Sequence, residues 1–286
     1  MNIIENKLQN IYHQLLSLLP LFKNICVKKI NSLPNQINKI IIGENKVSSY
    51  VGKTIKNLTE DDLAGATTIN SHSFYDCTNL NEVTIPDSVT SIKSSAFKNC
   101  TNLKSITIPD SVTSVDSYAF EDCTGLTSIT IPDSVTSISY CVLDGCTSLE
   151  SITIPFIGTS IRDNIYLGFL FGATSYRNHD RKVPASLKEV IISNQCLEIG
   201  LGFSGCQNLK SITIGSSVTR MVGNAFTSCG VTNLYMLPTT PPVFGENKPT
   251  LPTYTTIHVP IGSGEAYKSA TNWSLFADRI VEDIEL

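Results

Sequence analysis

The feature that most constrains this chain is an internal repeat with a period of 23 (108 − 85), whose clearest copy is CTNLKSITIPDSVTSVDSYAFED at 100–122. An Ile-Pro dipeptide marks each copy, and several other columns keep the same step. The columns are Ile85, Ile108, Ile131 and Ile154; Leu80, Leu103, Leu126 and Leu149; Val83, Ile106, Ile129 and Ile152; Phe74, Phe97, Phe120 and Leu143; and Cys77, Cys100, Cys123 and Cys146. A fixed period of this length, with so many apolar columns in register, indicates a solenoid of stacked coils.

One copy contains the parts of a complete coil. Ile106 and Ile108 flank Thr107, and this period of two predicts a short strand with one buried face. Pro109 has no N–H group to donate and therefore ends the strand, while Asp110 and the serine after it are typical of a turn. A single coil cannot bury its own apolar side, so coils must stack, with strands ~4.8 Å apart. The sequence therefore predicts a parallel sheet along one side of a curved rod.

The pattern SITIPDSV…AF…C, over roughly residues 68–236, resembles the BspA-type (Treponema-type) branch of the leucine-rich repeat family. The resemblance implies an α/β-type repeat solenoid, a right-handed superhelix with a parallel β-sheet on its concave face and short strands and turns on its convex side. It also implies a non-enzymatic recognition or adhesion protein, displayed on a bacterial or protist surface, that binds host proteins, matrix or other cells.

The chain divides into three predicted segments: residues 1–50, a helical and linker segment; residues 51–237, the solenoid; and residues 238–286, which resemble the family's C-terminal cap. Apolar residues at a and d spacing predict a helix over residues 2–22, which either packs on the first coil or joins chains in a homo-oligomer. The run at residues 37–42, closed by Gly43, predicts a linker or a small separate hairpin. In the cap we expect a strand at Thr256–Val259 and short helices at Gly264–Ala270 and Trp273–Asp278.

The repeat is interrupted by an insertion. The leucine column moves from Leu149 to Leu187, a step of 38 (187 − 149), so the segment 156–184 is longer than a regular copy by 15 (38 − 23). Insertions in solenoids form loops, often on a binding face. The insertion concentrates aromatic and arginine side chains, which either contact a partner or fill the core. The candidate partner-binding residues here are Tyr166, Phe171, Tyr176, Arg177 and Arg181.

The exposed face of the predicted sheet is a second candidate for partner binding. It carries a row of threonines with little charge and, as far as the pattern predicts, no aromatic residue to anchor a partner. Threonine is also a good strand former, so the row has a purely structural explanation as well. The candidate residues are Thr84, Thr107, Thr130, Thr153 and Thr213.

The chain shows no motif for catalysis, and we predict no enzyme activity, no cofactor and no metal site. Six of the nine cysteines fall in one repeat column, which predicts buried thiols, with disulfides between coils as the alternative. Asp87, Asp110 and Asp133 follow the prolines, as turn residues or as calcium ligands. The bend from Gly262 to Gly264 is a cap turn or an anion site at a helix N-terminus.

Bulk properties restrict the partner. The net charge of −4 gives no reason to expect a nucleic-acid partner. The longest apolar run, residues 15–22, is too short to insert in a membrane. No clean small-residue cleavage site follows that run, so a signal peptide is not expected. We expect a protein or cell-surface ligand and a location at the cell surface or outside the cell. Two alternatives are a tail or receptor-binding protein of a phage or prophage virion and an intracellular interaction scaffold.

Overall fold

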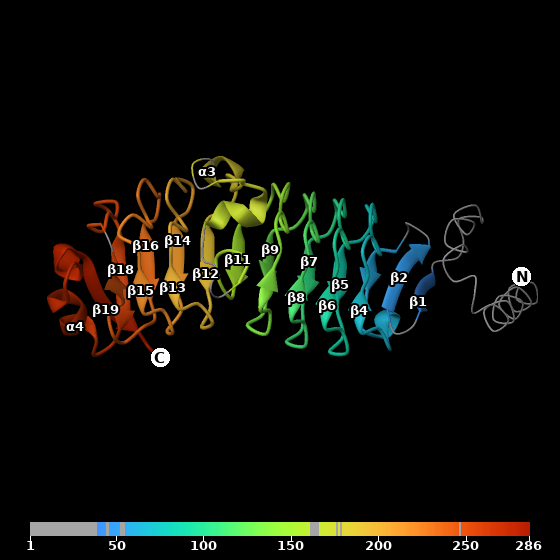
Figure 1. Ribbon diagram of the computed structural model, residues 1–286, viewed down its shortest axis with the longest axis horizontal. Coiled ribbons are helices and arrows are strands. Elements are labelled where there is room, and N and C mark those ends of the chain that lie inside the picture. Colours follow the sequence, from blue (N-terminus) through green and yellow to red (C-terminus); the bar gives the residue numbers. More distant parts are fainter. Residues whose placement is uncertain are drawn as a thin grey trace, which may run out of the picture.

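A computed structural model describes residues 39–43, 46–51, 55–160, 166–175, 177, 179–245 and 247–286 of the chain. These residues form an elongated stack of coils that follow one another along a single axis (Figure 1). A regular coil contributes one strand to each of two parallel ladders, so the predicted solenoid is confirmed. The helix predicted at residues 2–22 lies outside the described residues.

The first ladder contains the Ile-Thr strands of the repeat. Its strands pair in parallel, in a three-stranded sheet β3–β5–β7 and a seven-stranded sheet that runs from β9 to β19. The strands are β3 (Asn57–Leu58), β5 (Glu82–Thr84), β7 (Ser105–Thr107), β9 (Ser128–Thr130), β11 (Ser151–Ile154), β12 (Glu189–Ile192), β14 (Ser211–Ile214), β16 (Asn233–Met236), β18 (Thr256–Pro260) and β19 (Ile280–Ile284). The last strand, β19, was not predicted, and it adds one more parallel strand beyond the expected end of the sheet.

The second ladder is made mostly of two-residue strands. They are β4 (Thr68–Ile69), β6 (Ser91–Ile92), β8 (Ser114–Val115), β10 (Ser137–Ile138), β13 (Glu198–Ile199), β15 (Arg220–Met221) and β17 (Val243–Phe244). On its N-terminal side β1 (Lys39–Gly43) and β2 (Lys46–Val51) form an antiparallel hairpin. Because β2 pairs with β4, this hairpin is neither a linker nor separate, and it extends the stack before residue 51, where we placed the first coil.

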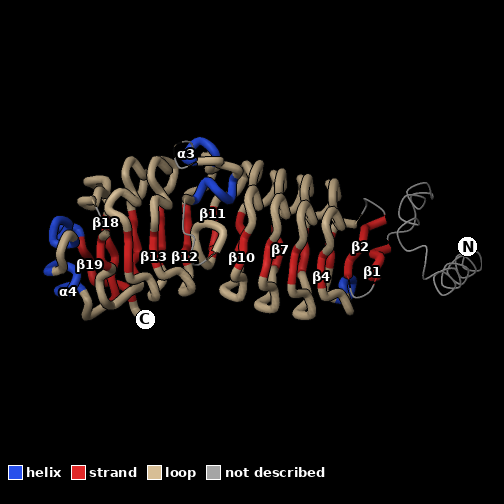
Figure 2. The backbone as a smooth tube through the Cα atoms, viewed as in Figure 1, coloured by secondary structure: helices blue, strands red, loops and turns tan. Residues whose placement is uncertain are grey.

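Helices occur at three places in the described residues, and Figure 2 shows them in blue at the insertion and at the two ends of the stack. They are η1 (Asp61–Leu63), η2 (Leu167–Phe171), α3 (His179–Lys182), α4 (Gly264–Ser269) and η3 (Trp273–Arg279). The two cap helices match the predicted ones within a residue or two. The buried indole of Trp273 lies 5.0 Å from the ring of Tyr267, so the cap closes the apolar core with aromatic side chains.

The repeat columns form continuous stacks inside the solenoid. The Phe74, Phe97 and Phe120 rings lie 5.1 and 5.6 Å apart and nearly parallel. Fully burying such a side chain contributes about 1.5–3 kcal/mol. The cysteine column lies beside it, and its members are free, buried thiols, as predicted. The Cys123 thiol donates a hydrogen bond to the carbonyl of Phe97 in the preceding coil, at 3.2 Å.

Serine hydroxyls hold each coil to the one before it. Ser88, Ser111 and Ser134 occupy one repeat column, and each donates to a carbonyl oxygen of the preceding coil, at 2.7–2.8 Å. The acceptor groups are the carbonyls of Ala66, Val89 and Val112. These bonds satisfy backbone acceptors in turns that have no partner from the ladders. The richness of the repeat in hydroxyl residues therefore has a structural role between coils.

Candidate functional site

The threonine row forms on the first ladder as predicted. Thr84 pairs with Thr107, and Thr130 pairs with Thr153, so these side chains are neighbours along the sheet. Thr107 and Thr130 are exposed, whereas Thr84, Thr153 and Thr213 are half-buried. Successive side chains of a strand point to opposite faces, and Ile106 and Ile129 accordingly lie in the core.

The row continues beyond the threonines with larger side chains. From Thr153 the register passes to Ile191, then to Thr213, Tyr235 and His258, and ends at Val281 on β19. We define these last members, Ile191, Tyr235, His258 and Val281, together with Asn233 and Asp283, as the aromatic end of the row. The aromatic end was not predicted, because the predicted row ended at Thr213 and Thr256–Val259 was assigned to the cap. The triplets Asn233–Tyr235 and Thr256–His258 continue the repeat at steps of 22 (233 − 211) and 23 (256 − 233), and this signal was available in the sequence.

Two rings stack at the aromatic end. The ring centroids of Tyr235 and His258 are 4.4 Å apart, with an angle of 18° between the planes. The Nδ1 atom of His258 lies 2.7 Å from a carboxylate oxygen of Asp283, and its Nε2 atom lies 3.3 Å from the side-chain oxygen of Asn233. The expectation of an aromatic-free face is therefore wrong, because Tyr235 of the last coil and His258 of the cap form an aromatic pair on it. Such a pair has the size and rigidity of an interface anchor.

The insertion places only part of its candidate residues at the surface. Arg177 and Arg181 are exposed, and Tyr176 lies outside the described residues. Tyr166 is buried, its hydroxyl donates to the carbonyl of Ala173 at 3.3 Å, and burial raises its pKa. Phe171 is 1% exposed. We therefore withdraw Tyr166 and Phe171 as partner contacts, since reaching a partner would require the coil to open.

Phe171 belongs to the phenylalanine column of the repeat. In regular coils the N–H of Phe97 donates to Ala119 and that of Phe120 to Val142, each acceptor standing one residue before the next member of the column. The N–H of Leu143 donates in the same way to Leu170, at 2.8 Å. Phe171 therefore takes the next place in the column, and the extra residues of the insertion stand on both sides of it in the sequence. Figure 1 shows α3 of the insertion projecting from one edge of the stack.

A buried histidine fixes the second part of the insertion. His179 begins α3, is buried, and packs so closely on η2 that a Cβ atom on Gly168 would lie 2.6 Å from its Cα atom. Desolvation lowers its pKa, although Asp180 and a hydrogen bond with the backbone of Ser204 raise it in part. Its Nδ1 atom has no hydrogen-bond partner in the described residues. With no carboxylate or nucleophile held against that nitrogen, we assign His179 a packing role.

The remaining chemical candidates have structural explanations. Burial raises the pKa of Cys146 to about 12, and its thiol donates to the Phe120 carbonyl, so it is not an activated nucleophile. In the described residues no three His, Cys, Asp or Glu side chains gather as metal ligands, and Asp87, Asp110 and Asp133 are exposed turn residues. The turn before α4 already holds an anion, because the Gly262 N–H donates to the carboxylate of Glu282 at 3.1 Å.

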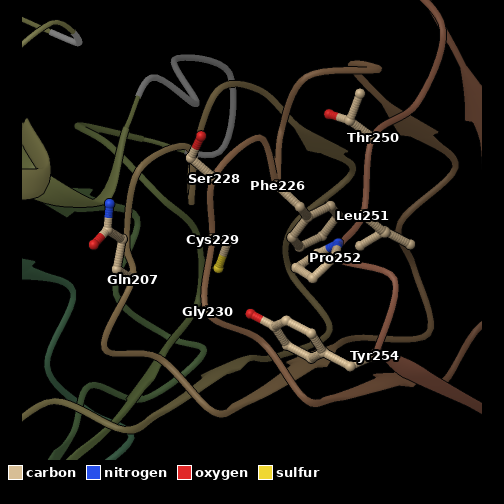
Figure 3. Close-up of a pocket in the computed structure, with 9 residues that line it drawn as sticks. All are labelled: Gln207, Phe226, Ser228, Cys229, Gly230, Thr250, Leu251, Pro252 and Tyr254. Atoms are coloured by element: carbon tan, nitrogen blue, oxygen red, sulfur yellow. The ribbon is translucent and has the colours of Figure 1, made fainter.

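A cavity of about 440 Å³ opens between the coil at residues 206–230 and the segment that leads into β18. Figure 3 shows Gln207 and Cys229 on one side, Phe226 beside Leu251 and Pro252 on the other, and Tyr254 along one edge. None of its lining residues is charged. In the described residues no helix has the length and apolar character needed to cross a membrane.

These features define a protein scaffold of the leucine-rich repeat class. The model of the BspA type leucine rich repeat region matches residues 45–169 and 183–247 in six copies. The chain therefore belongs to the BspA-type leucine-rich repeat family. The gap in this match, residues 170–182, falls within the insertion.

Solved structures of similar proteins come from several bacteria. A leucine-rich repeat protein of T. pallidum is 25% identical, with a TM-score of 0.44, over 69% of this chain and 89% of that one. One from Bacteroides capillosus is 27% identical over 37% of this chain and 83% of that one, with a TM-score of 0.32. The pneumococcal vaccine antigen PcpA is 14% identical, with a TM-score of 0.46; the match spans 86% of this chain but 45% of that one. A comparison with curated proteins gives no match.

Proposed function

We propose that this chain is a non-enzymatic recognition protein that binds a protein or cell-surface partner through the first ladder. The contact surface is the row from Thr84 to Val281, which we call the exposed row. The observation that carries the proposal is the continuous register from Thr130 to Val281, which places one side chain that is exposed or half-buried on each of seven neighbouring strands. A rigid row of this kind presents many weak contacts at once, and the aromatic end adds an anchor.

Adhesion at the surface of a cell is the role that we propose for this binding, in line with what family resemblance implies. The exposed arginines of the insertion, Arg177 and Arg181, are proposed as secondary contacts. Self-association through residues 2–22 stays a prediction. The alternative of a virion protein, which would use that helix for oligomerisation or attachment, stays a prediction as well. The alternative of an intracellular scaffold would use the same row with a different partner.

The test is binding of the labelled full chain to immobilised matrix proteins and to epithelial cells. A double variant, Thr107→Lys with Thr130→Lys, places two bulky charges on the exposed row, and Tyr235→Ala removes the anchor. We expect each to weaken binding at least tenfold, about 1.4 kcal/mol. The matched control, Ser114→Lys with Ser137→Lys, carries the same charges on the second ladder and should bind as the native chain does. Equal losses in both double variants would contradict the proposal.

A further inference from the structure

The cavity between the coil at residues 206–230 and the segment at residues 250–254 combines an apolar floor with an uncharged polar rim. Its floor is apolar, with the buried side chains of Phe226 and Cys229. Its rim is polar and uncharged, with Gln207, Ser228 and Thr250. Its volume of about 440 Å³ lies within the usual range for small-molecule sites, roughly 300–1,000 Å³.

The aromatic wall of this cavity is open to solvent. Tyr254 is 60% exposed, and Figure 3 shows its ring beside Gly230 and Pro252 with the hydroxyl directed over the cavity. The described residues provide no hydrogen-bond partner for the side-chain polar atoms of Gln207, Ser228 or Tyr254. These groups are available for a ligand, since nothing in the described fold requires them.

The segment that carries Tyr254 is held firmly on both sides. The Thr250 N–H donates to the carbonyl of Gly223 at 2.9 Å, and the buried Thr255 hydroxyl donates to the carbonyl of Val231 at 2.8 Å. Between them the guanidinium of Arg279 donates to the carbonyl of Pro252. A wall fixed in this way loses little conformational entropy when a ligand binds. The backbone that carries the exposed ring is therefore held in place before binding.

We propose that this cavity binds a neutral sugar residue, with the C–H face of the sugar on the Tyr254 ring and its hydroxyls on the uncharged rim. The negative face of an aromatic ring suits polarised C–H groups, and amide and hydroxyl side chains both donate and accept, as sugar hydroxyls do. A charged ligand would lose its hydration without gaining an ionic partner here, which disfavours acidic sugars. This inference concerns a site outside the exposed row and is independent of the proposed function.

The experiment uses the full chain with methyl glycosides of glucose, galactose, mannose and N-acetylglucosamine, and with glucuronic and sialic acid as charged probes. Saturation-transfer NMR should detect at least one neutral glycoside, with a Kd on the order of 1 mM, and neither acidic sugar. No signal from any neutral glycoside, or equal signals from the acidic sugars, would overturn the proposal.

Variants then locate the bound sugar. Tyr254→Ala should weaken binding at least tenfold, and Tyr254→Phe, which keeps the ring, should retain it. The matched control is Tyr75→Ala, because Tyr75 is also an exposed tyrosine (38%) but lies on another coil. Unfolding curves confirm that each variant is folded. Native affinity in Tyr254→Ala, or the same loss in Tyr75→Ala, would refute the assignment even if a sugar binds.

Discussion

The regular coils at residues 77–154 and the coil that carries the insertion build the same core from different sequences. In the regular coils every column returns at each period of the repeat, and Phe97 stacks on Phe120. In the insertion the chain departs from this period, yet Phe171 takes its place in the phenylalanine column and Ile152 pairs directly with Val190. The ladder positions, and not the spacing along the chain, therefore define a coil.

The difference shows where a solenoid tolerates variation. The free-energy cost of closing a loop rises only slowly as the loop lengthens, so extra residues at one edge of a coil destabilise the fold little. A missing core side chain destabilises the fold strongly, because it leaves a cavity that the neighbouring coils cannot fill. This contrast explains why the insertion divides around Phe171.

The largest effect that tests this comparison is expected from truncating the phenylalanine column. Phe171→Ala should lower the free energy of unfolding by about 3–5 kcal/mol, as much as Phe120→Ala in a regular coil, because both leave a cavity in a fully buried stack. Urea unfolding followed by circular dichroism measures both. The exposed Arg181→Ala is the control within the insertion and should change stability by less than about 0.5 kcal/mol. A cost for Phe171→Ala below about 1 kcal/mol would show that the insertion does not share the core.

A second difference is the buried histidine of the insertion, and it predicts a dependence on pH. Burial lowers the pKa of His179 in the folded chain, whereas the unfolded chain binds the proton near pH 6.5. Between these pKa values the unfolded state holds more protons, so stability falls as the pH drops below about 6.5, by at most about 1.4 kcal/mol per pH unit.

This contribution is measured as the difference between the native chain and His179→Gln in urea unfolding at pH 7.5 and 5.5. Every other residue is the same in both proteins, so the difference isolates the contribution of His179. We expect the native chain to lose more stability than the variant on acidification. Identical losses would mean that His179 is solvated in the folded state.

The smallest effect concerns the serine bonds between coils. Ser134→Ala in a regular coil and Ser186→Ala after the insertion should each cost about 1 kcal/mol, because each leaves a backbone carbonyl without its donor. Ser134 donates to Val112 at 2.8 Å, and Ser186 donates to Leu149, across the insertion, at 2.7 Å. Equal values from urea unfolding would show that the stack resumes fully after the insertion. A negligible loss of unfolding free energy for Ser186→Ala alone would show that the insertion weakens the contact between the coils on its two sides.

The repeat period predicted most of the strands and the core columns. What it did not predict has physical causes. The Ile-Pro column located the strands, and the cysteine column correctly indicated buried thiols, because both depend on local patterning. The aromatic end was missed, since Tyr235 replaces a threonine in a column that tolerates any exposed side chain. Strand β19 was missed because its sequence, IVEDI, does not alternate apolar and polar residues regularly. Its pairing partner is β18, a strand of the cap.

By itself, the sequence determined the solenoid, the parallel sheet along one side of it and the identity of the columns, because a repeated apolar pattern admits only stacking as a way to bury it. Only the tertiary structure decided that Phe171 belongs to the core, that Glu282 occupies the turn before α4, and that Tyr254 borders an open cavity. These facts depend on which segments meet across the stack, and residues distant in sequence meet there without any local signal. The repeat is thus the frame, and its interruptions and its capped end carry the individual features of this protein.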